Sequence, residues 1–462
     1  MIKEDKIFTK SSVMEIAAAD LFDWHARAGA IERLSPPWDP VRVIETTGGI
    51  TVGNKISLKV KSGPFFCNWY AQHTDYIKDE MFRDEQISGP FSKWIHTHHV
   101  KPLGEKKCIL EDQIEFRLPF YLPGAVFDRF IMGKLGKIFV YRHRITMEEI
   151  KIHQQYTNRS KLNILISGAS GLIGSALIPF LTTGGHNVTR LIRDKNLTNR
   201  NSRFWDPLHG VLDLRKTDHF DAVIHLAGEN IGKGRWTAEK KKIITDSRIK
   251  STQLIAKTIC QLKKKPSVFI VASAIGFYGD RGEILLTEDD KPGNGFLSDL
   301  CSNWENTASD AVARQIRTAF MRIGVVLTPE GGALKRLLLP VKLGAGCKFS
   351  SGRQYMSWIS IDDVIGSIHH ILMNDNIYGP INLVSPNPVR NETFIKVLGK
   401  ILMRPTFLPM PAWGINLLFG EMGREILLSS TKVIPKKLLE SGYKFRYPDL
   451  EKTFNHLLGR NI

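Results

Sequence analysis

The stretch SGASGLIG, residues 167–174, holds the residues best suited to chemistry. It follows the apolar run NILI and precedes a run with helical spacing, so we expect a turn between a strand and a helix. In such a turn Gly168 permits a tight bend, Gly171 lets backbone N–H groups approach a diphosphate, and Gly174 lets the helix pack close to the strand. The helix N-terminus adds partial positive charge. We therefore expect a dinucleotide to bind here, in contact with Gly168, Gly171, Leu172, Ile173 and Gly174.

The end of the next expected strand, TRLIRDK, indicates which dinucleotide binds. Proteins that use NAD usually carry an acidic residue at this place, where it accepts hydrogen bonds from the ribose hydroxyls. Here Arg193 stands at the expected strand end, and a guanidinium can pair with the 2′-phosphate of NADP(H). The sequence therefore favours NADP(H). Because Asp194 follows directly, NAD(H) stays open as the less favoured alternative.

The elements around this turn read as strands alternating with helices, the pattern of a doubly wound parallel sheet. The expected strands are residues 163–168, 186–193, 221–228, 267–274 and 318–327. Earlier in the chain, residues 7–118 read mainly as strands with alternating apolar and polar residues, and residues 125–150 have helical spacing. We therefore expect an α/β Rossmann domain with a small helical C-terminal appendage, preceded by an α+β domain whose curved sheet closes on one long helix.

A polar stretch, residues 150–163, separates the two patterns and reads as a linker. The expected organisation is a front domain at 1–156, a linker at 157–161, a Rossmann domain at 162–400 and a C-terminal helical domain at 401–456.

Bulk composition narrows the function classes. The chain has 462 residues, which predicts two or three domains, and a net charge of +18, which attracts anions such as phosphate-rich cofactors. Its basic clusters fit solvated helix faces, so we expect no nucleic-acid partner. The five cysteines form no C-x-x-C pair, which argues against a disulfide framework and suggests a cytoplasmic protein. The sequence shows no secretory signal and no apolar run of 18 residues, so we expect no membrane span.

Several motifs resemble those of an extended or atypical short-chain dehydrogenase/reductase of the NAD-dependent epimerase family. They are GASGLIG, HLAGEN, RWTAEKKKIITDSRIKSTQLI, SAIGFYGDRGE, RIGVVLTPEGGAL and MSWISIDDV. The tail from RPTFLPMPAW to YPDLE resembles the C-terminal domain of unknown function found in the sugar-nucleotide epimerase-like group of that family. The resemblance implies that Leu226, Ala227 and Gly228 line the adenosine side of the cofactor and that Arg248 lies on the helix beside it.

The catalytic residues that the resemblance implies are incomplete. Such enzymes use a serine and a Tyr-x-x-x-Lys pair, in which the lysine ammonium lowers the tyrosine pKa. In the corresponding segment, GNGFLSDLCSNWE, the tyrosine position falls on Phe296 or Leu297 and the lysine position on Leu300 or Cys301. We predict Ser273 and Tyr278 as the catalytic pair. Ala274 is the alternative register of the serine, and the remaining candidate groups are Glu229, Glu283, Glu288 and Cys301.

Two hypotheses about function follow from this mixed picture. The chain is either an NADP(H)-dependent oxidoreductase or epimerase-like enzyme, or a catalytically silent NADP(H)-binding sensor or carrier of a lipid-like ligand. The glycine turn fits both hypotheses, whereas the missing tyrosine and lysine favour the second. The substrate, the reaction direction and the oligomeric state are not determined by the sequence.

The front domain resembles the helix-grip fold of START-like and polyketide-cyclase-like (SRPBCC) domains, through FDWHARAGAIERLSPPW, MFRDEQISGPFSKWIHTHHV and LEDQIEFRLP. The resemblance implies an apolar cavity that binds a small apolar or aromatic molecule. Strand alternation places Trp94, His96 and His98 on one face. Two imidazoles so spaced can chelate a metal, with Asp84 or His25 as further ligands, but no fixed third ligand is evident. We therefore expect polar cavity groups and no metal site.

Overall fold

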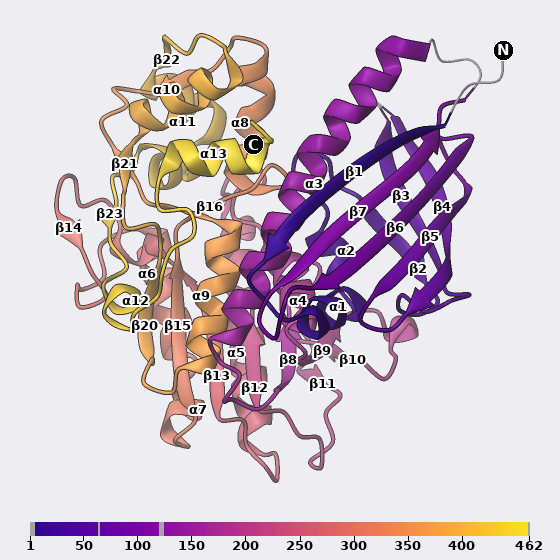
Figure 1. The fold of residues 1–462 in the computed structure, drawn as a ribbon. Helices are drawn as coiled ribbons and strands as arrows, with labels where there is room; N and C mark the ends of the chain where they lie inside the picture. The colour runs from indigo at the N-terminus through magenta and orange to yellow at the C-terminus, as the bar shows by residue number, and fades with distance from the viewer. Residues whose placement is uncertain (1–4, 63–64, 120–123, 461–462) are drawn as a thin grey trace. The chain divides into compact units, whose positions relative to one another are not determined.

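The computed structural model describes residues 5–62, 65–119 and 124–460 (Figure 1). Contacts within the chain divide it into two compact units, one built mainly from residues up to Ser160 and the other mainly from Lys161 onward.

The first unit is a seven-stranded antiparallel sheet with one long helix against it (Figure 1). The strand order is β1-β7-β6-β5-β4-β3-β2. The strands are β1 (Lys6–Met14), β2 (Arg42–Thr46), β3 (Lys55–Ser62), β4 (Phe65–Ile77), β5 (Met81–Ser88), β6 (Lys93–Pro102) and β7 (Cys108–Arg117). The helices are α1 (Ala18–Ala26), α2 (Ala30–Arg33) and α3 (Gly124–Gln154).

Alternation along β7 shows why this sheet forms. Every second residue from Cys108 to Phe116 is buried, so the strand presents one face to the interior. On that face Ile114 and Phe116 pack against Leu135 and Phe139 of α3. Burial of each such side chain contributes about 1.5–3 kcal/mol. The expected helix-grip domain is confirmed.

The second unit is an eight-stranded sheet in the order β11-β10-β9-β8-β12-β13-β15-β20. Its strands are β8 (Asn163–Ser167), β9 (Asn187–Ile192), β10 (Ser202–Asp206), β11 (Val211–Leu212), β12 (Ala222–His225), β13 (Val268–Ala274), β15 (Arg317–Ile323) and β20 (Gly379–Leu383). All neighbours pair in parallel except β10 and β11. Because β8 lies between β9 and β12, the strand order reverses there, and ligands of such sheets bind at the carboxyl ends of the strands beside that point. The Rossmann fold is confirmed.

One expected strand is wrong in its extent. Residues 318–327 were expected as one strand, but the chain leaves the main sheet at Gly324. The strand β15 ends at Ile323, and β16 (Val325–Leu327) pairs instead with β19 (Trp358–Ser360). A Cβ atom on Gly324 would lie 2.6 Å from the carbonyl oxygen of Ser357. Only glycine lets the two backbones come this close, which is why the apolar run divides here.

Helices and short strands complete the second unit. The helices are α4 (Leu172–Thr183), α5 (Ala238–Cys260), α6 (Phe296–Asn306), α7 (Ser309–Ala313), α8 (Gly332–Lys342), α9 (Ile361–Met373), α10 (Asn391–Leu402), α11 (Ala412–Phe419), α12 (Lys436–Glu440) and α13 (Leu450–Leu458). The short strands are β14 (Leu285–Leu286), β17 (Cys347–Phe349), β18 (Tyr355–Met356), β21 (Val389–Arg390), β22 (Leu408–Met410) and β23 (Lys432–Val433). Within the described residues, none of the helices combines the length and the apolarity needed to cross a bilayer.

The C-terminal segment, residues 403–460, is joined to the eight-stranded sheet and its helices by specific contacts. The strand β23 pairs in parallel with β14. The carboxylate of Glu425 accepts hydrogen bonds from the backbone N–H groups of Phe296 and Leu297, at 3.0 and 2.9 Å. These donors are the first two of α6, which have no partner within their own helix. Glu425 therefore caps a helix that lies far away in the sequence.

Candidate functional site

The glycine turn lies where the sequence predicts, between the end of β8 and the start of α4. Gly168 has φ +75°, a backbone conformation that other residues rarely adopt. A Cβ atom there would lie 2.7 Å from the carbonyl carbon of Leu226, and one on Gly174 would collide with the carbonyl oxygen of Gly168. Both positions therefore require glycine, because the turn packs directly on the loop that follows β12.

The start of α4 is suited to an anion. Its first turn, Leu-Ile-Gly-Ser, carries no acidic side chain, so the positive end of the helix dipole is not neutralised locally. Leu172 and Ile173 are half-buried in this turn. The N–H group of Gly171 donates to the carbonyl oxygen of Gly168 at 3.0 Å, which closes the turn. Gly171 itself is exposed.

The loop after β12 brings Leu226, Ala227 and Gly228 to the same edge of the sheet as the glycine turn. The backbone N–H group of Leu226 donates to the carbonyl oxygen of Ser167, the last residue of β8, at 3.2 Å. A Cβ atom on Gly228 would lie 3.2 Å from the guanidinium carbon of Arg248. The structure therefore brings together the small residues and the arginine that the resemblance placed beside a cofactor.

Arg248 is held firmly beside this loop. Its guanidinium donates to the carbonyl oxygens of Ile244 and Glu229, at 3.1 and 3.0 Å, and lies over the ring of Trp304 at 5.0 Å. Burial lowers its pKa from the ordinary arginine value. The side chain is thus fixed by backbone carbonyls and an aromatic face.

Arg193 directly follows β9 and is exposed. The adjacent Asp194 has a different role, because its carboxylate accepts a hydrogen bond from the backbone N–H group of Asn196 at 2.9 Å. This bond caps the short 3₁₀ turn Lys195–Leu197. Both side chains are exposed, and the carboxylate is engaged by its own loop.

His225, the last residue of β12, is a site residue that the sequence analysis missed. Its Nδ1 lies 2.5 Å from the Ser167 hydroxyl and its Nε2 lies 2.9 Å from the Ser251 hydroxyl. Burial, together with nearby Arg248, lowers the pKa of His225 to about 3. The neutral ring thus ties the ends of β8 and β12 to α5. The signal was a histidine that ends an apolar strand directly before LAG.

The predicted catalytic residues meet in a buried polar network. The Ser273 hydroxyl donates to the Glu305 carboxylate at 2.7 Å. Arg322 makes two hydrogen bonds to the same carboxylate, both at 2.9 Å, and donates to the Tyr278 hydroxyl at 3.0 Å. The Tyr278 hydroxyl in turn donates to the Asn382 side chain at 2.7 Å. One arginine therefore connects the two predicted residues.

The buried surroundings of Tyr278 determine the protonation state of its hydroxyl. The side chain is fully buried, and burial raises its pKa to about 12, so it is protonated at neutral pH. Arg322 lies over the Phe277 ring at 3.4 Å, which fixes the guanidinium further. The catalytic roles of Ser273 and Tyr278 stay predictions. Sequence reasoning missed Arg322, although a charged residue within the apolar run TAFMRIGVVL was a usable signal.

The other residues that the sequence offered as catalytic candidates do not share one site, and each has its own environment. The Glu229 side chain pairs with Lys240 at 2.5 Å, and Glu283 pairs with Arg390 at 3.1 Å. Glu288 is buried, which raises its pKa, and it accepts from the backbone N–H group of Asn382 at 3.0 Å. Burial raises the pKa of Cys301 to about 11, so its thiol is protonated at neutral pH.

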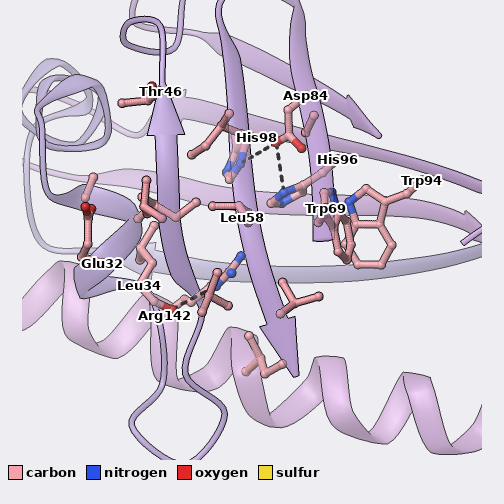
Figure 2. Close-up of a pocket in the computed structure, with 18 of the residues that line it drawn as sticks. Glu32, Leu34, Thr46, Leu58, Trp69, Asp84, Trp94, His96, His98 and Arg142 are labelled. Atoms are coloured by element: carbon pink, nitrogen blue, oxygen red, sulfur yellow. Dashed lines mark hydrogen bonds and ion pairs between the residues drawn. The ribbon is translucent and has the colours of Figure 1, made fainter. Parts of the chain in front are cut away.

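The first unit encloses a cavity of about 1020 Å³ (Figure 2). Trp94, His96 and His98 all line it, which confirms the strand alternation. Most of the wall is apolar or aromatic, including Leu58, Trp69, Phe91, Phe127, Ile131 and Phe139. The cavity is large enough for a small organic molecule.

The histidines of β6 are coupled to buried carboxylates. Burial alone would lower the pKa of His96, but its hydrogen bond to Asp112 and the nearby negative charge of Asp84 outweigh burial and raise the pKa to about 8. Burial lowers the pKa of His98 to about 3, and the neighbouring charge of His96 acts in the same direction. Burial also opposes ionisation of Asp112, but His98 and His143 hold its pKa well below the usual range. The cavity wall therefore carries a compact group of opposite charges.

Family comparisons agree with this architecture. Residues 164–383 match the model of the NAD dependent epimerase/dehydratase family. Residues 14–135 match the polyketide cyclase / dehydrase and lipid transport model, and residues 410–457 match a domain of unknown function, DUF1731. An epimerase family protein of Mycobacterium bovis is 35% identical over 297 residues, which are 64% of this chain and 98% of that protein. The chain belongs to the epimerase family. The resemblance seen in its motifs is thereby confirmed.

Two solved structures are similar to the chain. A nucleoside-diphosphate sugar epimerase from Corynebacterium glutamicum has 30% identity and a TM-score of 0.81, over 98% of this chain and 90% of that one. Human epimerase family protein SDR39U1, solved with NADPH, has 32% identity and a TM-score of 0.59, over 65% of this chain and 100% of that one. The first match extends over both units, whereas the second covers only part of the chain.

Proposed function

We propose that this epimerase family member binds NADP(H) in its second unit and a small, largely apolar molecule in its first. The observation that carries the cofactor assignment is the glycine turn pressed onto the loop after β12, where side chains at Gly168 and Gly174 would fill the cradle. The α4 N-terminus without acidic residues suits the diphosphate, and exposed Arg193 suits the 2′-phosphate. The NADPH in the human relative supports the same choice.

The reaction class that fits this unit best is an oxidoreductase or epimerase-like one, since a bound nicotinamide supplies hydride transfer. In this proposal Ser273 and Tyr278 act at the carboxyl edge of β13, with Arg322 and Glu305 holding their hydroxyl groups in place. The apolar cavity of the first unit would bind the small-molecule substrate or ligand.

A second candidate, a catalytically silent sensor or carrier, is supported by a specific observation. The Tyr278 hydroxyl is fully buried and already bonded to Asn382 and Arg322. In addition, Phe296, Leu297, Leu300 and Cys301 stand where the usual acid/base pair would be. In this candidate the protein would bind NADP(H) and the cavity ligand without turning either over.

Titration calorimetry of the purified protein with NADPH and with NADH tests the cofactor assignment. We expect saturable binding with a preference for NADPH. If neither nucleotide binds, the assignment is wrong. Cofactor oxidation, followed at the absorbance of the reduced nicotinamide with a panel of carbonyl compounds, then separates the two candidates, because only an enzyme consumes the cofactor.

We also propose that the protein acts in the cytoplasm. All five cysteines are free, although Cys67, Cys260 and Cys347 are partly accessible. Thiols of this kind persist in a reducing compartment. Fractionation of the cells that produce the protein, with detection by antibody, tests this location.

A further inference from the structure

Three side chains with ligand atoms for a metal meet on one wall of the first unit's cavity (Figure 2). Asp84 on β5 stands directly across from His96 on β6, and His98 follows two residues later on the same face. Directly opposed residues in antiparallel strands have Cβ atoms about 4.5–5.5 Å apart, and diagonal ones remain within reach. The sheet itself therefore fixes the spacing of the three groups.

The distances between these groups are those of a ligand set rather than of hydrogen bonds. His96 Nδ1 lies 3.5 Å and His98 Nε2 lies 3.9 Å from the same oxygen of Asp84. One ligand atom from each residue lies within 4.8 Å of the others. Protein hydrogen bonds are about 2.7–3.2 Å long. Two ligands of a tetrahedral ion, each about 2.1 Å from the metal, are about 3.4 Å apart.

One carboxylate lies beside the opposite nitrogens of both imidazoles: it is hydrogen-bonded to His96 and in close contact with His98. Asp112 on β7 stands directly across from His98. Its Oδ1 lies 2.5 Å from His98 Nδ1 and 3.1 Å from His96 Nε2. Histidines that bind metals almost always donate their second ring N–H to such a carboxylate, which fixes the tautomer and the ring orientation. The remaining nitrogen of each ring is thereby aimed at Asp84.

Asp112 is itself held from a second direction. Its other oxygen lies 2.5 Å from Nε2 of His143 on α3, and His143 Nδ1 lies 2.8 Å from the hydroxyl of Ser12 on β1. Asp112 and His143 are both buried. The positioning carboxylate is therefore connected to the sheet and to the long helix, and it does not depend on the cavity contents.

The three candidate ligands keep one side open. All three line the cavity, and the Asp84 side chain retains 20% of its exposure whereas those of His96 and His98 retain 6% and 9%. Asp84 and Asp112 supply two negative charges, and Arg142, which also lines the cavity, supplies one positive charge. The two carboxylates offer negative charge to a divalent cation, which would take the place of the proton on His96.

We propose that Asp84, His96 and His98 bind a divalent transition metal whose open coordination positions face the cavity of the first unit. Two imidazoles and one carboxylate suit Zn²⁺ and Fe²⁺ alike. This site is independent of the NADP(H) assignment, because all of its residues lie in the first unit. It also contradicts our sequence-based expectation that the chain has no metal site.

Titration of the chelator-treated full chain with Co²⁺ tests the proposal, because visible absorption reports the ligands of this ion. We expect one ion per chain. Asp84→Asn should weaken binding at least 100-fold while keeping the shape of the side chain. Asp112→Asn should weaken it about 10–100-fold, since it removes only the group that orients the imidazoles.

His99→Ala is the matched control, since His99 follows His98 on the same strand but points to the other face and does not line the cavity. It should bind Co²⁺ as the wild type does. Equal binding by Asp84→Asn and His99→Ala would overturn the proposal, as would no saturable binding by the wild type. Circular dichroism checks that each variant is folded.

X-ray absorption of the wild-type protein loaded with Zn²⁺, and separately with Fe²⁺ under anaerobic conditions, provides a test that needs no variant. The expected first shell contains two imidazole nitrogens and carboxylate or solvent oxygen. A shell with sulfur, or without two imidazoles, would overturn the assignment of these ligands. Whichever of the two ions gives the expected first shell at one ion per chain is the metal that this site binds.

Discussion

Replacement of Arg193 with alanine gives the sharpest test of which nucleotide the second unit binds. In NADPH the guanidinium would face a phosphate that NADH does not have. A hydrogen bond to a charged group contributes about 1.5–3 kcal/mol, whereas an exposed ion pair contributes up to about 1 kcal/mol. Because Arg193 is exposed, we expect its replacement to reduce the free energy of NADPH binding by about 1–2 kcal/mol, which lies between these two cases. This corresponds to about 5- to 30-fold weaker binding of NADPH, with NADH changed less than about twofold.

Calorimetric titration of both nucleotides at two salt concentrations measures this effect, because an exposed ion pair is screened by salt. Arg190→Ala is the matched control. Arg190 is also exposed and lies three residues earlier on β9, so its removal changes the net charge equally. If Arg193→Ala weakens NADPH and NADH to the same extent, or if Arg190→Ala has the same effect, the reasoning about the 2′-phosphate is refuted.

Three further predictions concern the glycine turn, the buried network and pH. Gly168→Ala should destabilise the protein by about 2 kcal/mol or more and abolish NADPH binding, because the new Cβ atom collides with the Leu226–Ala227 backbone and the φ is unfavourable for alanine. The control is Gly210→Ala, where φ is +70° and no atom lies within 4 Å of the added Cβ. In urea unfolding this control should lose only the free energy that the unfavourable φ costs. Tyr278→Phe should lower the free energy of unfolding by about 1–3 kcal/mol, since Asn382 and Arg322 each lose a partner; an unchanged urea midpoint would contradict the network. His225 has a pKa of about 3 in the folded chain, against about 6.5 when unfolded, so between these values only the unfolded state takes up its proton and stability falls as pH falls. Urea unfolding at pH 6.5 and pH 5 should show about 1.6 kcal/mol less loss in His225→Gln than in the wild type; equal losses would show that His225 is not buried as a neutral ring.

Much of the fold could be predicted because periodicity reports which side of an element is buried. The alternation along β7 and the helical spacing of α3 are local properties, and they survive in the structure. The break at Gly324 was missed because its cause is not local. A carbonyl oxygen of Ser357, 33 residues later, approaches the backbone at that point, and no pattern in the strand records this.

The candidate site, too, could be predicted from the sequence only where its geometry is local. The glycine turn was predictable because its spacing follows from the geometry of one bend between a strand and a helix. The partners of Ser273 and Tyr278 were not, because Glu305, Arg322 and Asn382 come from three different elements. Likewise, strand alternation placed His96 and His98 on one face, but only the pairing of β5, β6 and β7 shows that Asp84 and Asp112 lie on either side of them.

The cap that Glu425 places on α6 bears on how the C-terminal segment should be regarded. A chain cut after Leu402 would lose this carboxylate and the strand that pairs with β14. It would also lose the carbonyl oxygen of Ile434, which accepts from the Asn382 side chain at 3.1 Å. The helix that occupies the place of the usual acid/base pair would then begin with bare amide groups. The segment of unknown function is thus a structural component of the cofactor unit, and shortened versions of this protein should be expected to misfold rather than to isolate a working core.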